Sequence, residues 1–409
     1  MGQAVGHDGR YERRHEQQCT GLHSGRRGAF RTADDRPRDL PPPGKPQAGG
    51  RVPASSRTGH VAEFRPCCPQ PADWLGRGLV TLEDVSRLQV VSGKGGTGKT
   101  TVAAALALAL ATEGKRTLLV EVEGRQGIAQ RFETEALPYE ERKIAVAPGG
   151  GEVFALAIDP ELALLDYLQM FYKLGSAGRA LKKLGAIDFA TTIAPGLRDV
   201  LLTGKACEAV RRKDKTGRFR YDYVVMDAPP TGRITRFLNV NDEVAGLAKI
   251  GPIHNQAQAV MRVLKSAETA VHLVTLLEEM PVQETADGIA ELRAARLPVG
   301  RVIVNMVRPE VLDAADLELV RTVPRATVAR SLSAAGLGGA RRGGHAERLV
   351  DPLLAQAEEY AERHTLEHEQ RAVLGELGLP LHELPLLAEG MDLAGLYELA
   401  TELRKQGMS

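Results

Sequence analysis

The sequence predicts an α/β fold built on a doubly wound, mostly parallel β-sheet. Short apolar runs recur from residue 88 onward, with long helix-like stretches between them. Strands that are buried on both faces of a parallel sheet have this continuous apolar character. In addition, the first apolar run leads into a glycine-rich loop and then into an alanine- and leucine-rich segment. This order is typical of a strand, a ligand-binding loop and a buried helix.

Six segments have the length and composition of buried strands. They are residues 88–91, 117–121, 153–158, 223–226, 270–275 and 301–305. Two stretches depart from the strand–helix alternation, and we expect helical insertions there, at about 160–195 and 309–378. The first is rich in leucine and aromatic residues, and the second is charged throughout.

Residues 1–80 differ in composition from the rest of the chain. They contain nine of the 23 prolines, are rich in arginine and glycine, and show no helical or strand periodicity. A segment of this kind cannot bury enough apolar surface to fold. We expect a disordered tail; the alternative is that the start of the chain is mis-assigned and the real polypeptide begins nearer Leu79.

Composition argues against several classes of protein. The formal net charge is +1, so we expect no nucleic-acid partner, because dedicated binders carry a strongly basic face. No apolar run is long enough for a membrane span and no signal peptide precedes the core, which predicts a cytoplasmic protein without stable membrane insertion. The four cysteines include no C-x-x-C pair, so neither a disulfide framework nor a thiolate zinc site is expected.

The glycine-rich loop matches the G-x-x-x-x-G-K-[ST] pattern of a P-loop, from Gly93 to Thr100. Glycines allow backbone N–H groups to approach phosphate oxygens, and the following helix N-terminus adds partial positive charge. Lys99 is expected to reach the β- and γ-phosphates, and the Thr100 hydroxyl to bind Mg²⁺. The residues predicted to hold the nucleotide here are Gly93, Gly95, Gly96, Thr97, Gly98, Thr100 and Thr101.

A second carboxylate is needed for Mg²⁺ at the end of a neighbouring strand. The segment YDYVVMDAPPTGR supplies Asp227 directly after an apolar run, so Asp227 is predicted to be the Walker B aspartate. Hydrolysis also needs a group that orients water. Glu121 and Glu123 share one face of their strand; Glu123 is favoured because it stands at the loop, and Glu121 remains the alternative.

The loop has the form K-G-G-T-G-K-T, with Lys94 five residues before Lys99. It resembles the deviant Walker A ATPases. Within them, DAPPTGRITRFLNV and LLVEVEGRQGIAQRF are similar to the ArsA-type branch, which includes arsenite-pump and tail-anchored-protein-targeting ATPases, and VEVEGRQGIAQ resembles its actinobacterial members. The resemblance covers about residues 86–405. It implies a P-loop NTPase core, with ATP and Mg²⁺ as cofactors.

The resemblance also implies roles for particular residues. Lys94 would reach a phosphate across a dimer interface and act with Lys99, Glu123 and Asp227 in catalysis. Asn305 and the loop around Pro385 would hold adenine, and the turn from Asp227 through Gly232 would be switch II. The implied function is a Mg²⁺-dependent ATPase in which nucleotide-driven dimer closure is coupled to an unidentified cargo or partner. The dimer is either a homodimer or a heterodimer with a paralogous ATPase subunit.

The chain departs from the family pattern after the second strand. Glu123 stands where the family has aspartate, and Gly124, Arg125 and Gln126 replace proline, alanine and histidine. The departure predicts slow or differently gated hydrolysis. It motivates an alternative function, a nucleotide-gated scaffold or regulatory subunit with little intrinsic hydrolysis that acts with a paralogous ATPase.

One further motif is interpreted as a coincidence. His364, Glu367 and His368 form an H-x-x-E-H arrangement that some zinc proteases use. The surrounding segment is charged on all sides, which is typical of a solvated helix face. We therefore expect no metal there.

Overall fold

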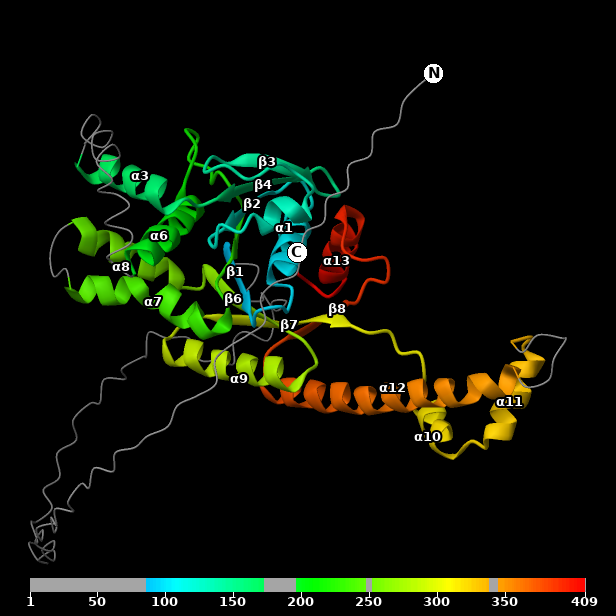
Figure 1. Cartoon of the computed structure of the whole chain (residues 1–409). Helices are drawn as coiled ribbons and strands as arrows, with labels where there is room; N and C mark the ends of the chain where they lie inside the picture. Colours follow the sequence, from blue (N-terminus) through cyan, green and yellow to red (C-terminus); the bar gives the residue numbers. More distant parts are fainter. Residues whose placement is uncertain (1–85, 173–195, 248–251, 338–344, 409) are drawn as a thin grey trace, which may run out of the picture. The chain divides into compact units, whose positions relative to one another are not determined.

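The computed structural model describes residues 86–172, 196–247, 252–337 and 345–408. Its centre is an eight-stranded sheet with the order β3-β4-β2-β5-β1-β6-β7-β8 (Figure 1). Every neighbouring pair is parallel except β3 and β4, which are antiparallel. The predicted fold class, a mostly parallel doubly wound α/β core, is confirmed. The strands are β1 (Leu88–Gly93), β2 (Arg116–Glu121), β3 (Arg142–Val146), β4 (Glu152–Ala157), β5 (Tyr223–Asp227), β6 (Thr269–Thr275), β7 (Val299–Val307) and β8 (Leu381–Pro385).

All six predicted strands are present, with ends that differ by one or two residues. Sequence analysis predicted neither β3 nor β8, which form the two edges of the sheet. Edge strands are covered less completely, so their residues do not form a continuous apolar run. In β8 only His382 and Leu384 are buried, and in β3 no residue is fully buried.

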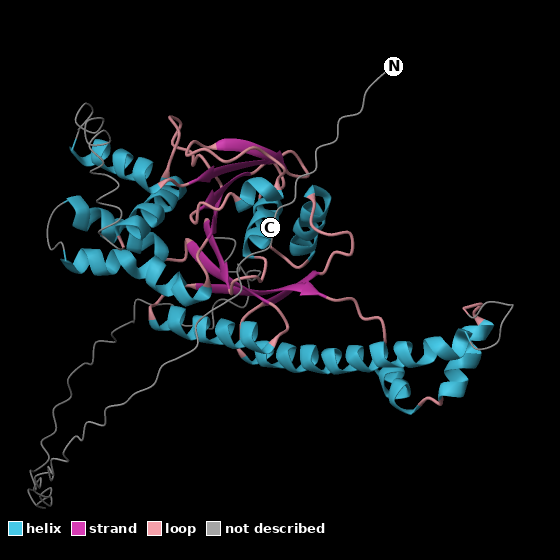
Figure 2. Ribbon diagram, in the orientation of Figure 1, coloured by secondary structure: helices cyan, strands magenta, loops and turns pink. Residues whose placement is uncertain are grey.

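Helices lie on both faces of the sheet (Figure 2). One face carries α1, α2 and α13, and the other carries α3, α6, α7, α8, α9 and the C-terminal end of α12. The helices are α1 (Lys99–Leu110), α2 (Gly127–Arg131), α3 (Pro160–Tyr172), α6 (Leu197–Arg211), α7 (Thr231–Leu247), α8 (Pro252–Leu264), α9 (Glu279–Ala294), α10 (Ala314–Thr322), α11 (Arg325–Ala334), α12 (His345–Glu376) and α13 (Leu393–Lys405).

The first helix, α1, is buried along almost its whole length. Its alanines and leucines contact the sheet on one side, and α13 packs on it through Leu396, Leu399 and Leu403. A helix that is apolar on all sides requires this kind of two-sided cover. As a result, the P-loop, which leads into α1, rests on a rigid part of the core.

The two predicted insertions differ in how far the structure describes them. In the first, α3 is present, and residues 173–195 lie outside the described part of the chain. The second forms α10, α11 and α12 within the connection from β7 to β8, and α10 and α11 pack against α12 (Figure 1). The tail predicted for residues 1–80 also lies outside the described part. Among the described helices, none has both the length and the low charge needed to cross a bilayer.

Candidate functional site

The P-loop lies at the carboxyl end of β1, in the middle of the sheet. Gly98 precedes α1 in a left-handed conformation (φ +85°), and its carbonyl accepts the first helical bond from the N–H of Val102 at 3.0 Å. Inside the loop, the Thr97 hydroxyl donates to the carbonyl of Lys94 at 2.9 Å. In a parallel sheet, the carboxyl ends of the strands form the usual binding edge.

Two glycines of the loop are required by close contacts. A Cβ at Gly93 would lie 2.2 Å from the carbonyl oxygen of Val274 on β6. A Cβ at Gly98 would lie 2.4 Å from Nδ2 of Asn305, and the positive φ of Gly98 adds strain for any other residue. The backbone of the loop can therefore lie against β6 and β7 only with glycine at these positions.

Asn305 and Pro385 line a cavity of about 420 Å³ together with residues of the P-loop. The buried amide of Asn305 donates to the carbonyl of Thr97 at 2.9 Å, which ties β7 to the loop. Met306, the next residue, has a positive φ of 57°, an uncommon conformation that often marks functional sites. The predicted site residues that line the cavity are Gly96, Gly98, Lys99, Thr100, Thr101, Asn305 and Pro385.

Sequence reasoning missed several residues of this cavity. Met306, Arg131, Leu387 and Met391 also line it. The volume lies within the range of small-molecule sites, and an apolar lining with a few polar groups is typical of them. Met306 lies near the end of β7, Leu387 and Met391 follow β8, and Arg131 ends α2. They come together at the cavity from three separate parts of the chain, and no role was predicted for any of them. The other predicted residues do not line the cavity: Gly93, Lys94, Gly95, Thr97, Glu123, Asp227 and Gly232.

Thr100 and Asp227 face each other across the ends of β1 and β5. The Thr100 hydroxyl donates to Oδ2 of Asp227 at 2.6 Å. Asp227 is 8% exposed, and burial raises the pKa of its carboxyl to about 6, while the Thr100 hydrogen bond and nearby Lys99 oppose that rise. A hydroxyl and a carboxylate oxygen are hard ligands of the type that Mg²⁺ prefers. The pair therefore fits a Mg²⁺ site.

The two candidate glutamates have different partners. Glu121 is 2% exposed, and its carboxylate accepts hydrogen bonds from the backbone N–H groups of Gln126 and Ile128. Glu121 therefore caps the turn that leads into α2. Glu123 is 22% exposed in its side chain, and its nearest charged partner is the exposed Arg125 at 3.7 Å. Both glutamates raise the pKa of Asp227 electrostatically, so both lie near the predicted metal site.

Lys94 forms an ion pair with Glu284 that the sequence motif does not predict. Its Nζ lies 2.8 Å from Oε1 of Glu284 on α9, and Oε2 of Glu284 lies 3.3 Å from the Thr231 hydroxyl. Thr231 begins α7, and Gly232 follows it in an exposed position. Glu284 thus joins the second lysine of the P-loop to the segment predicted to be switch II. No local signal predicts it, because Glu284 is far from both residues in the sequence.

The H-x-x-E-H residues lie on α12 and do not line this cavity, although Glu367 lines a smaller cavity of about 90 Å³ that shares Asn305 and Met306 with it. Glu367 accepts a hydrogen bond from Arg308 at 3.1 Å, and His364 lies 3.9 Å from Glu310. Among the described residues, no group of three histidine, cysteine or acidic side chains is arranged to hold a metal ion.

Comparison with known proteins agrees with this geometry. The profile of the anion-transporting ATPases matches residues 86–267. ATPase BagA of Mycobacterium tuberculosis is 53% identical over 328 residues, which cover 79% of this chain and 94% of that protein. The arsenical pump-driving ATPase of Escherichia coli is 27% identical over 251 residues, 56% of this chain and 41% of the relative. ATPase GET3 of Kluyveromyces lactis is 27% identical over 251 residues, 53% of this chain and 71% of the relative.

Proposed function

Because this chain belongs to the family of anion-transporting, ArsA-type ATPases, we propose that it binds ATP with Mg²⁺ and hydrolyses it to drive a conformational change in a dimer. The observation that carries this proposal is the Thr100–Asp227 pair at the mouth of the P-loop. That pair places the two predicted Mg²⁺ ligands in contact, beside the lysine predicted to bind the phosphates.

In this proposal the chain acts mainly by positioning and charge. Lys99 would neutralise charge on the transferring phosphoryl group, and Thr100 and Asp227 would hold Mg²⁺, which would supply further positive charge at the phosphates. Glu123 orients the attacking water, because Glu121 is already used to hold the turn before α2. Lys94 leaves Glu284 and reaches a phosphate when the dimer closes. Release of the γ-phosphate then lets the segments after β2 and β5 relax, which is how such sites drive a partner.

The test is steady-state ATP hydrolysis by the full chain with Mg²⁺, with molar mass measured by light scattering in parallel. We expect turnover by the wild type, loss of turnover in Lys99→Ala and Asp227→Ala, and a stable ATP-bound dimer in Glu123→Gln. If Lys99→Ala and Asp227→Ala both retain activity, the site is assigned wrongly.

A second candidate function is a nucleotide-gated scaffold that acts with a paralogous ATPase subunit. The contacts of Gln126 favour it: its side-chain amide both accepts from the backbone N–H of Leu137 at 2.6 Å and donates to the carbonyl of Leu137 at 3.3 Å. These bonds hold the turn after β2 in one conformation and would slow a switch there. Tight ATP binding without turnover or self-association in the same assay would support this candidate over the first.

A further inference from the structure

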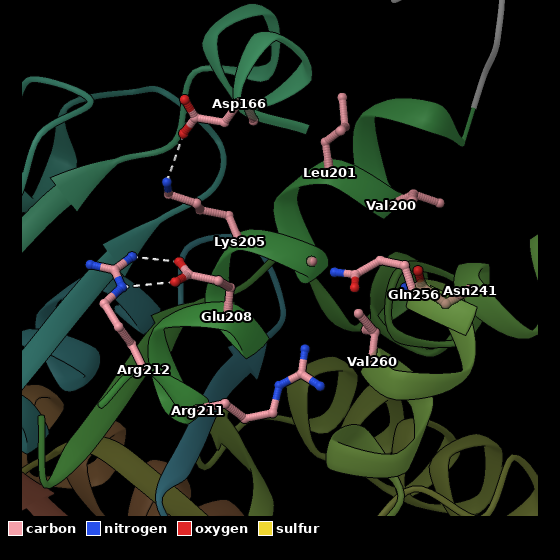
Figure 3. Close-up of a pocket in the computed structure, with 12 residues that line it drawn as sticks. Asp166, Val200, Leu201, Lys205, Glu208, Arg211, Arg212, Asn241, Gln256 and Val260 are labelled. Atoms are coloured by element: carbon pink, nitrogen blue, oxygen red, sulfur yellow. Dashed lines mark hydrogen bonds and ion pairs between the residues drawn. The ribbon is translucent and has the colours of Figure 1, made fainter. Parts of the chain in front are cut away.

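A second cavity lies among α3, α6, α7 and α8, in the helical layer on the opposite face of the sheet from α1 (Figure 3). Its volume is about 540 Å³, within the range of sites for small organic molecules. Val200, Leu201 and Val260 give it an aliphatic wall, and Gly204 on α6 leaves open space in the lining, since a Cβ there would meet no atom within 4 Å.

Most of the charges around this cavity are already paired. Lys205 lies 2.9 Å from Asp166, and Nε of Arg212 donates to Glu208 at 2.8 Å (Figure 3). Arg212 also pairs with Glu141. Paired groups of this kind are satisfied within the protein and offer little net charge to a ligand.

Asn241 lines the cavity and has a buried acceptor without a partner. Its side chain is 1% exposed, its Nδ2 donates to the Thr203 hydroxyl at 2.8 Å, and its Oδ1 has no partner in the described part of the protein. The orientation of the amide is set by Thr203, whose own hydrogen is used on the carbonyl of Asp199 at 2.7 Å. A buried carbonyl without a donor costs free energy that a bound N–H or hydroxyl group would recover.

Arg211 provides the unpaired charge. Its Nε makes a long hydrogen bond of 3.3 Å to the carbonyl of Cys207. Its guanidinium points toward Val260 and Gln256, as Figure 3 shows. No carboxylate pairs with it among the described residues. One guanidinium matches one carboxylate in a two-pronged contact, whereas a phosphate dianion would leave charge unmatched.

We propose that this cavity binds a small aliphatic carboxylate that carries an N–H or hydroxyl donor. The carboxylate pairs with Arg211, the donor reaches Oδ1 of Asn241, and the aliphatic body lies against Val200, Leu201 and Val260 beside Gly204. N-acyl derivatives of aliphatic amino acids have all three features. The site shares no lining residue with the nucleotide cavity, so its occupancy is measurable without ATP.

The experiment titrates the full chain, free of nucleotide, with N-acetyl-L-leucine and with its methylamide, which lacks the carboxylate, and follows binding by ligand-observed NMR. For a probe of this size we expect saturable binding at millimolar concentration. The methylamide should bind about tenfold more weakly or worse, a loss of about 1.4 kcal/mol. Arg211→Gln should lower the affinity for N-acetyl-L-leucine by a similar factor and leave the affinity for the methylamide unchanged. Arg198→Gln, an exposed position on the same helix, is the matched control and should behave as wild type.

Two further variants separate binding from folding. Gly204→Leu fills the cavity and should abolish binding of both probes, while leucine in place of glycine favours the helix. Asn241→Leu removes the unsatisfied acceptor, so it should lower the affinity for both probes without lowering the midpoint temperature of thermal unfolding. Equal affinity for the two probes, unchanged binding in Gly204→Leu, or no saturable binding by wild type up to about 20 mM would each overturn the proposal.

Discussion

At the scale of single residues, the ion pair between Lys94 and Glu284 is only partly buried. The two side chains are 28% and 37% exposed, and partly exposed pairs contribute only about 0.2–1 kcal/mol. A triphosphate offers more negative charge than one carboxylate. We infer that the ion pair between Glu284 and Lys94 is weak and that it breaks when a nucleotide binds.

The variant Glu284→Gln should therefore bind ATP more tightly, by up to about fivefold, because Lys94 no longer has to leave a carboxylate. The measurement is nucleotide affinity by fluorescence titration, with Glu279→Gln, an exposed glutamate on the same helix, as the control. Weaker binding in Glu284→Gln alone would mean that Glu284 orients Lys94 toward the phosphates.

Asn305 provides a second test at this scale. Its buried Nδ2 donates to the Thr97 carbonyl, and Asn305→Asp places an acceptor against that oxygen. We expect ATP affinity to fall about tenfold or more, with a smaller loss in Asn305→Ala, which removes the bond without adding repulsion. Asn255→Asp on the exposed surface of α8 controls for the added charge. Equal losses in the two Asn305 variants would contradict this reading.

Sequence analysis found the site residues that belong to local sequence patterns and missed those that only the fold brings to the site. Gly93 to Thr100 is a local pattern, because one loop must wrap one phosphate group, and Asp227 follows a recognisable strand. Glu284 and Met306 carry no such pattern. Glu284 reaches Lys94 only because α9 passes the P-loop, and Met306 lies where the register between β7 and β8 shifts.

At the scale of elements, polar side chains cross the sheet on adjacent strands. His272 on β6 is fully buried; its Nε2 lies 2.5 Å from Oε1 of Gln89 on β1, and its Nδ1 accepts from the backbone N–H of Arg301 on β7 at 3.1 Å. Burial, with a smaller effect of His382, lowers the pKa of His272 from 6.5 to about 3. The ring is therefore neutral in the folded protein at neutral pH.

This lowered pKa predicts a pH dependence of stability. The unfolded chain takes up a proton on His272 below about pH 6.5, whereas the folded chain does so only near pH 3, so the contribution of His272 is present above pH 6.5 and is lost as pH falls. By pH 4 the loss is on the order of 3 kcal/mol. Urea unfolding of wild type and His272→Gln at several pH values should show a steeper decline for wild type. His368→Gln, an exposed histidine on α12, should follow wild type; a parallel decline in all three would contradict the prediction.

The position of each strand in the sheet explains why the six inner strands were predicted and the edge strands β3 and β8 were not. The six inner segments are apolar because helices cover both of their faces. β3 and β8 each have a partner strand on one side only and keep polar residues, such as Lys143 and Glu383, that pair with Glu152 and Arg371. Pairing of this kind stabilises an edge without leaving an apolar run in the sequence.

At the scale of the whole molecule, a continuous series of contacts joins the two cavities. Glu121 holds the turn at Gln126, and Gln126 holds Leu137. Two residues later, the Tyr139 hydroxyl donates to Asp166 at 2.7 Å, and Asp166 borders the second cavity. A change in the turn after β2 can therefore reach α3 through few covalent and hydrogen-bonded steps.

If both proposed sites are occupied, these contacts predict that each ligand changes the affinity for the other by the same factor. Tyr139→Phe removes the hydrogen bond to Asp166 and should bring that factor toward one, with little effect on either ligand alone. The measurement is the affinity for N-acetyl-L-leucine with and without ATP and Mg²⁺. The control is Tyr397→Phe, which removes a hydroxyl that bonds to the carbonyl of Val146 on the other face of the sheet. If ATP still changes the affinity for N-acetyl-L-leucine by the same factor in Tyr139→Phe, the two sites are not coupled through the Tyr139–Asp166 hydrogen bond.

The cover that α13 places over α1 has a consequence for biosynthesis. A ribosome makes α1 early and α13 only after nearly all the rest of the domain, since synthesis runs from the N-terminus at about 5–20 residues per second. Until then, one flank of the alanine- and leucine-rich α1 stays uncovered, and Lys99 and Thr100 stand on a helix without its final support. A nascent or cleaved chain that lacks α13 should therefore be a client of chaperones rather than an early form of the working site.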